Sequence, residues 1–289
     1  MKAQVSLTPN EAKRLIAKAI VALPEVQAAL AGGRVLLKGG TTVSAVAEEL
    51  GAMPLRISGR VSALGAKAAW GTEKTAPHSV LIERGEPRNV DDSLEQTVER
   101  LRGTDVAIIG ANAIDVYGNA ALMAGAPLGG PPGRILAGLL AQGTRIVIAA
   151  GLEKLIPGRI EEAMRAAGRS SAKVAMGMAV GLMPVYGRLV TEREAFTILA
   201  NVQCTVIGAG GIMGGEGSTT LVLEGEEDEV RKAFALAEAV KGSPLSGCIE
   251  SLEECGPGCP SCRQHLACIY RQPKLAKARA GTSQPREGQ

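Results

Sequence analysis

Apolar and polar positions are arranged along the first 160 residues as short apolar runs that alternate with stretches of helical periodicity. The apolar runs predict buried strands at 34–37, 105–110 and 145–150. Apolar residues at helical spacing predict helices over 9–23, 43–50, 92–102 and 133–142. This alternation predicts an α/β fold with a mostly parallel, Rossmann-like sheet and helices on both faces.

Weaker signals extend this pattern. Thr8, Pro9 and Glu11 have the spacing of a helix start, with a capping box and a proline at the first helical position. Two short segments with β-branched residues, 55–58 and 79–83, are candidates for edge strands.

The pattern changes after a connector at 180–187. A helix at 192–200, strands at 204–208 and 219–224, and a helix at 226–241 predict a small α+β module. We therefore expect four parts. They are a Rossmann-like domain at 1–183, the α+β module at 188–245, a cysteine-rich metal-binding segment at 246–270 and a disordered tail at 271–289.

Composition limits the classes of function. Apolar residues make up 46% of the chain but only six residues are aromatic, so the core must be aliphatic. The net charge is only +3 and opposite charges are interspersed, which argues against nucleic-acid binding. No apolar run reaches the roughly 20 residues that span a bilayer, and no signal peptide is evident at the N-terminus. We expect a cytoplasmic protein that does not insert into membranes.

A glycine-rich loop lies where the first central strand leads into a helix. It consists of Gly39, Gly40, Thr41 and Thr42. Backbone N–H groups and two hydroxyls at a helix N-terminus suit a phosphate or a carboxylate. A plain turn in which threonine caps the helix is the alternative. The loop has neither the Walker lysine pattern nor three spaced glycines, so ordinary nucleotide-binding folds are disfavoured.

Polar side chains follow the second central strand. They are Asn112, Asp115, Tyr117 and Asn119. Ligands bind at the carboxyl ends of strands in open α/β sheets, so these residues predict a pocket with Asp115 as a candidate general base. The alternative is a turn that asparagine and aspartate stabilise by bonding to the nearby backbone.

Two segments resemble the superfamily of ribose-5-phosphate isomerase, glucosamine-6-phosphate deaminase, CoA transferases and the lactate-utilisation (LUD) domain. Residues 37–42 are similar to its first phosphate-binding loop, and 105–122 are similar to the strand and Gly-Asn turn of the LUD domain and the sugar-phosphate isomerases. The resemblance covers roughly 30–160 and is closest to the LUD domain. It implies a small anionic metabolite as ligand.

The chain departs from the enzymes of this superfamily at two positions. At the position that corresponds to Asn112, the isomerases have an acidic residue. A lysine precedes their later glycine run, whereas here Pro127-Leu128 precedes Gly129-Gly130. No glutamate can be assigned to the nucleophile of the CoA transferases. The resemblance therefore does not carry over isomerase or CoA-transferase catalysis.

Five of the six cysteines are clustered near the C-terminus. Cys255, Cys259, Cys262 and Cys268 have the spacing C-x3-C-x2-C-x5-C, and Cys248 is a further candidate ligand seven residues upstream. In a reducing compartment such a cluster predicts a metal site rather than disulfides. Thiolates bind both iron–sulfur clusters and zinc.

A [4Fe–4S] cluster is favoured over zinc because only one C-x2-C knuckle is present, with zinc as the alternative. His265 is a substitute ligand for one thiolate. Too little chain follows Cys262 for the barrel of a radical S-adenosylmethionine enzyme. Cys204 lies in an apolar run and is expected to be a buried small side chain.

A third glycine-rich stretch, 208–218, lies between two predicted strands and is long for a hairpin loop. It predicts either a lid over the pocket, with Glu216 as its one acid–base candidate, or a merely permissive loop. The expected function is binding of a small anionic metabolite by a LUD-like domain with a redox-linked iron–sulfur site. A metabolite-sensing module with structural zinc is the alternative. The expected protein partners are a second copy of the chain or a redox partner.

Overall fold

The computed structural model describes residues 1–68, 76–252, 254–255, 262 and 265–271. Its centre is a six-stranded mixed sheet, so the chain is an α/β protein. The strand order is β12-β10-β7-β2-β5-β6, and the first four strands of this order are mutually parallel. In chain order they are β2 (Arg34–Lys38), β5 (Ser79–Glu83), β6 (Glu86–Asn89), β7 (Val106–Gly110), β10 (Arg145–Ala149) and β12 (Arg188–Val190).

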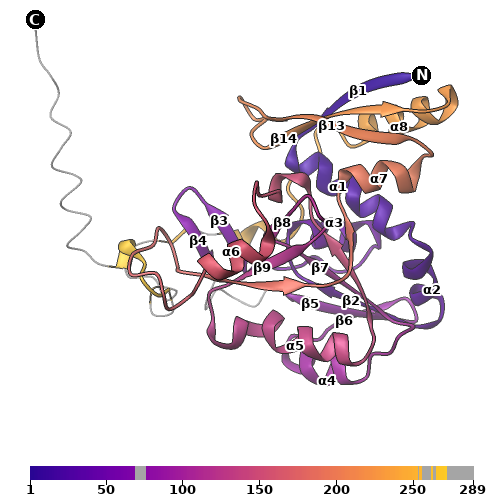
Figure 1. Ribbon diagram of the computed structural model, residues 1–289. Helices are drawn as coiled ribbons and strands as arrows, with labels where there is room; N and C mark the ends of the chain where they lie inside the picture. Colours follow the sequence, from indigo (N-terminus) through magenta and orange to yellow (C-terminus); the bar gives the residue numbers. More distant parts are fainter. Residues whose placement is uncertain (69–75, 253, 256–261, 263–264, 272–289) are drawn as a thin grey trace, which may run out of the picture.

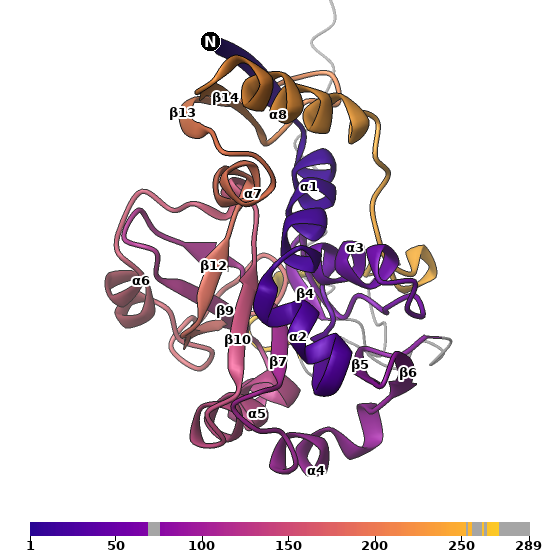
Figure 2. The ribbon, with the colours of Figure 1, turned by 90° about the vertical axis from the view of Figure 1, so that its right-hand side faces the viewer.

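Helices cover both faces of this sheet (Figure 2), because the side chains of a strand alternate between its faces. Val35 and Leu37 face one apolar core, and Leu36 faces the other. The first core is covered by α1 (Pro9–Val21), α2 (Pro24–Gly32) and α3 (Thr41–Glu49); the second by α4 (Leu94–Glu99) and α5 (Gly130–Ala141). The predicted capping box is present, because Thr8 N–H donates to Glu11 Oε2 at 2.8 Å.

One predicted edge strand is not at the edge. β5 pairs with β2 on one side and with β6 on the other, both antiparallel. Arg84 and Gly85 form the β5–β6 turn with φ of 54° and 81°, so a tight hairpin places β6 outermost. The prediction missed β6 because this strand contains proline and exposed polar residues. The other candidate, 55–58, makes only an isolated bridge, between Arg56 and Cys248.

A second sheet lies at one end of the molecule (Figure 1) and has the order β1-β14-β13. It consists of β1 (Lys2–Leu7), β13 (Gln203–Gly210) and β14 (Ser218–Glu224), with α7 (Glu192–Leu199) and α8 (Glu227–Ala239) packed against it. The sequence analysis did not predict β1. Only Val5 and Leu7 of this edge strand are buried, so its apolar signal is short.

The apolar core is continuous between this end of the molecule and the central sheet. Helix α1 packs against both α3 and α7, and the buried Leu221 and Leu223 of β14 belong to the same core as Val35 of β2. Strand β12, at the start of the expected α+β module, pairs with β10 in the central sheet. Described residues on both sides of the expected boundary at 183–188 therefore share one core and one sheet.

Smaller elements complete the fold. A three-stranded sheet contains β8 (Ala113–Ile114), β9 (Ala120–Ala124) and β11 (Gly181–Val185), and α6 (Ile160–Ala166) packs beside it. A hairpin is formed by β3 (Gly59–Ser62) and β4 (Gly65–Ala68). Single 3-10 turns occur at Asp91–Ser93, Pro127–Gly129, Leu152–Lys154, Ile249–Leu252 and Ile269–Arg271. Among the described helices, none alone has the length and apolar character needed to cross a bilayer; α1 and α2, bent by 62°, reach it only as a pair.

Candidate functional site

A cavity of about 390 Å³ lies at the carboxyl ends of the parallel strands β2, β7 and β10. Lys38 and Gly39 line it from the end of β2, and Asn112 lines it from the segment after β7. The strand order reverses here, since the chain continues from β2 to β5 on one side and returns to β7 on the other. Open α/β sheets bind ligands at such a position, and the volume is that of a small-metabolite site.

The glycine-rich loop forms one wall of the cavity. Gly39, Gly40, Thr41 and Thr42 all line it, and α3 begins at Thr41. The first N–H groups of a helix have no intrahelical acceptor and carry partial positive charge. No acidic side chain occupies the first turn of α3, so nothing in the helix itself neutralises this end.

Close packing of the backbone against His78 requires a glycine at position 39. Its N–H donates to the carbonyl of His78 at 2.7 Å, and a Cβ at this position would lie 2.4 Å from Nδ1 of the same histidine. No side chain larger than hydrogen fits here without displacing the imidazole. The loop and His78 therefore pack together as one wall of the cavity.

Among the described residues that line the cavity, the charged ones are all cationic. They are Lys13, Lys38, Arg60 and Lys154, and no aspartate or glutamate is among these described lining residues. The remaining lining residues are mostly apolar or glycine. This composition favours an anionic ligand that also has an apolar part.

Lys38 is the most unusual of these residues. It is the last residue of β2 and is only 2% exposed. Its Nζ has no hydrogen-bond partner within the described part of the chain. Burial lowers the pKa of Lys38 to about 7; the charge of Asp91 opposes this shift, whereas the charge of Arg56 adds to it.

Asp91, whose charge opposes the lowering of the Lys38 pKa, already has other binding partners. Asp91 Oδ2 accepts the backbone N–H of His78 at 2.9 Å and lies 3.4 Å from Nη2 of Arg56. His78 Nδ1 lies 2.8 Å from the carbonyl oxygen of Arg56. Because a carbonyl only accepts, Nδ1 carries the ring proton and Nε2 does not. Burial, and secondly the charge of Lys38, lowers the pKa of His78 to about 3, so the ring is neutral.

A second group of charges includes two of the lining lysines and lies where α1 faces the segment after β10. Glu153 Oε1 lies 3.7 Å from Lys13 Nζ and 3.8 Å from Lys154 Nζ. Burial lowers the pKa of Lys13, and the charge of Glu153 opposes this. Glu192, only 1% exposed, accepts hydrogen bonds from Leu152 N–H and the Thr219 hydroxyl. Burial raises the pKa of Glu192 to about 7.

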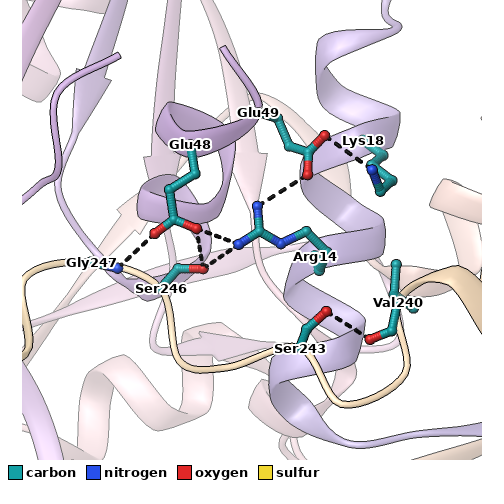
Figure 3. A network of polar contacts seen from close by, with 8 residues as sticks. All are labelled: Arg14, Lys18, Glu48, Glu49, Val240, Ser243, Ser246 and Gly247. Atoms are coloured by element: carbon teal, nitrogen blue, oxygen red, sulfur yellow. Dashed lines mark hydrogen bonds and ion pairs between the residues drawn. The ribbon is translucent and has the colours of Figure 1, made fainter. Parts of the chain in front are cut away.

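Another rim of the cavity is fixed by a polar network that joins α1, α3 and the segment after α8 (Figure 3). Glu48 of α3 accepts hydrogen bonds from Arg14, from the Ser246 hydroxyl at 3.0 Å and from Gly247 N–H at 3.0 Å. Glu49 binds Arg14 at 3.0 Å. The network thereby ties the chain at 246–247 to α3, and the neighbouring Leu245 lines the cavity.

The structure separates the polar residues that were predicted to follow the second central strand. Asn112 lines the cavity, and its Oδ1 accepts the N–H of Met123 at 2.9 Å. Asp115, Tyr117 and Asn119 are not among the lining residues. Tyr117 is 62% exposed, and its ring packs under the guanidinium of Arg159 at 4.3 Å.

Asp115 lies in the turn between β8 and β9. It accepts hydrogen bonds from the N–H groups of Tyr117, Asn119 and Ile160 and from the Asn119 side chain, at 2.9 to 3.1 Å. Burial raises its pKa, but these bonds outweigh that effect, so the pKa of Asp115 is lowered. These bonds support the alternative prediction, in which Asp115 stabilises its own turn. The bond from Ile160 also ties the start of α6 to this turn.

The glycine-rich stretch 208–218 is the end of a hairpin rather than a wall of the cavity. β13 continues to Gly210 and pairs with β14 as far as Ser218. Glu216 accepts the N–H of Gly214 at 3.0 Å within the turn. No residue of this stretch is among those that line the cavity. The arrangement supports the permissive loop rather than the lid.

The cysteine-rich segment is described only in part. Cys262 and Cys268 are buried, Cys248 is half-buried and next to Leu55, and Cys259 lies outside the described residues. Within the described part of the chain no group of three histidine, cysteine or acidic side chains is arranged to hold a metal ion. The metal site, whether iron–sulfur or zinc, stays a prediction. As expected, Cys204 is buried in β13, and burial raises the pKa of its thiol to about 12.

Sequence reasoning missed the cations of the cavity. Lys38 lies within the segment 37–42 that resembles a phosphate-binding loop but was not predicted as a site residue, although a lysine at the end of an otherwise apolar, doubly covered strand is itself a signal. His78, Lys13 and Lys154 come from separate parts of the chain and have no motif.

Comparison with family models, with curated proteins and with solved structures finds no match for this chain. The resemblance to the LUD domain and its superfamily therefore stays a prediction, and the site rests on its own geometry.

Proposed function

We propose that the chain binds a small anionic metabolite, a carboxylate or a phosphate ester, in the cavity at the carboxyl ends of β2, β7 and β10. The observation that carries the proposal is a cavity whose charged lining residues, in the part of the chain that the structure describes, are four cations and no carboxylate. The N-terminus of α3 adds partial positive charge and free N–H donors to the same wall.

The surroundings of the cavity agree with this assignment. Its position is the one at which Rossmann-like sheets bind ligands, and the doubly covered, mostly parallel strands support counting this sheet among them. The apolar lining residues, including Ile109 and Leu122, suit a ligand with a short carbon skeleton. The resemblance of residues 37–42 to a phosphate-binding loop points to the same chemistry.

Binding can be tested with simple anions. Isothermal titration with inorganic phosphate and with acetate should show binding at constant ionic strength, whereas chloride should give none. Thr41→Asp places a negative charge at the proposed contact. It should weaken binding about tenfold or more, because like charges a few ångströms apart repel by more than the roughly 1.4 kcal/mol that a factor of ten represents.

A matched variant controls for the added charge. Gln96→Glu adds a carboxylate at an exposed position in the first turn of α4, a helix that does not line the cavity. An acidic residue stabilises the first turn of a helix, so both variants should fold. Gln96→Glu should bind as the wild type does. Equal binding by wild type and Thr41→Asp, or no binding of either anion, would contradict the proposal.

A further inference from the structure

Lys38 is the feature of the cavity that anion binding alone does not explain. The N-terminus of α3 and the three other cations already supply positive charge for an anion. The Nζ of Lys38 is buried and has no hydrogen-bond partner among the described residues. An ammonium is rarely fully buried without a partner, since its desolvation is then uncompensated.

The groups around Lys38 are arranged so that none of them holds an ammonium. Asp91 is bound by Arg56 and by the backbone N–H of His78. The His78 ring is neutral and donates its one proton to a carbonyl oxygen. Lys38 is therefore present to a large extent as the free amine at neutral pH, as its lowered pKa also indicates. A free lysine amine that is shielded from water is a nucleophile for carbonyl carbons.

The amine and the proposed anion contact are within reach of one small molecule. Lys38 precedes Thr41 by three residues, so their Cα atoms are at most about 11 Å apart. Both residues line the same 390 Å³ cavity. A metabolite with an anionic group at the α3 N-terminus can thus carry a carbonyl group to Lys38.

We propose that Lys38 forms a Schiff base with the carbonyl group of an anionic aldehyde or ketone, such as a 2-oxo acid or a phosphorylated sugar. The lysine nitrogen attacks the carbonyl carbon, and one of the two protons of the amine passes to the carbonyl oxygen to give a carbinolamine. The nitrogen then gives up its other proton as the hydroxyl leaves as water, so that a C=N bond replaces C=O. This step needs no oxidant or reductant, and it rests on the anion-binding function proposed above.

Reductive trapping tests the proposal on the full chain. The protein is incubated at pH 7 with glyoxylate, a small anionic aldehyde, and with cyanoborohydride, which reduces an imine to a stable amine. Peptide mapping by mass spectrometry should find one carboxymethyl group on Lys38. The exposed Lys232 of α8 serves as the internal reference. Labelling of Lys38 should be at least about tenfold faster, because its lowered pKa leaves much of its amine unprotonated at pH 7.

Two comparisons separate this proposal from anion binding. Inorganic phosphate should slow the labelling of Lys38 but not of Lys232, and uncharged acetaldehyde should label Lys38 more slowly than glyoxylate does. Labelling confined to exposed lysines, in protein that binds phosphate, would overturn the Schiff base and leave the anion site standing. If Lys38 is labelled fast, at equal rates by both aldehydes and regardless of phosphate, the result would support a reactive Lys38 amine and contradict the proposed anion site.

Discussion

Replacing Lys38 by methionine should stabilise the protein near neutral pH. Folding moves the pKa of this side chain from an ordinary 10.5 to about 7, because the ammonium is desolvated without a partner. Each unit of pKa corresponds to 1.36 kcal/mol, so at pH 7 the wild type is destabilised by about 4 kcal/mol relative to a chain without this titration. Methionine has a similar unbranched shape and no charge, so it removes this cost with little change in packing.

The sign of the pH dependence follows from the same shift. Below pH 7 both the folded and the unfolded chain bind a proton at Lys38, so the full cost of burying the ammonium favours unfolding. Between pH 7 and pH 10.5 the folded chain carries the free amine while the unfolded chain is still protonated, and the cost of releasing that proton falls as the pH rises, so the penalty shrinks. The advantage of Lys38→Met over the wild type should therefore be larger at pH 7 than at pH 9.

Urea denaturation followed by circular dichroism at pH 7 and pH 9 measures both quantities. Lys232→Met is the matched control, because this lysine is 57% exposed on α8 and its removal should change the unfolding free energy by less than about 0.5 kcal/mol. A Lys38→Met protein less stable than the wild type at pH 7, or a stability difference that does not change with pH, would refute the reasoning. Either result would mean that the folded protein provides a partner for the ammonium.

Three further predictions concern other parts of the molecule. Asp115→Ala should lower the unfolding free energy by about 3 kcal/mol in urea denaturation, because it leaves the buried N–H of Ile160 and two turn N–H groups without their acceptor. The carboxyl of Glu192 has a pKa raised to about 7, so its stabilising protonated form is lost as the pH rises through 7. The stability of the wild type should therefore fall between pH 5 and pH 8 relative to Glu192→Gln, and parallel curves would contradict this. Anaerobically purified protein should contain iron and absorb in the visible range, and Cys259→Ser should lose both; stoichiometric zinc without colour would establish the alternative metal.

The parts of the fold that the sequence predicts are those with strong local periodicity. Apolar runs buried on both faces, such as that of β7, and helices with a clear apolar stripe, such as α1, are found close to their predicted bounds. β1 and β6 were missed because both lie at sheet edges, where few side chains are buried and polar residues interrupt the pattern. Their pairing is decided by tertiary contacts that no short window contains.

The candidate site likewise contains some residues that the local sequence predicts and others that it does not. The glycine loop at 39–42 was placed from local sequence alone, because a strand that meets a helix through glycines has a recognisable form. Lys13, His78 and Lys154 reach the cavity from distant segments, so only the folded chain brings them together. Asp115 shows the opposite error, since an Asx turn and a catalytic aspartate have the same appearance in a sequence.

The pairing of the first strand with one of the last also has a consequence for synthesis of the protein. Lys2 of β1 is opposite Glu224 of β14, and the terminal amine donates to the carbonyl of Gly225 at 2.7 Å. At a translation rate of about 5–20 residues per second, the first strand waits roughly 10 to 45 seconds for its partner to be made. During that time the apolar stripe of α1, which includes Leu15 and Ile16, lacks α7 and α8 to cover it. The nascent chain therefore carries α1 with part of its apolar face uncovered until α7 and α8 have been made.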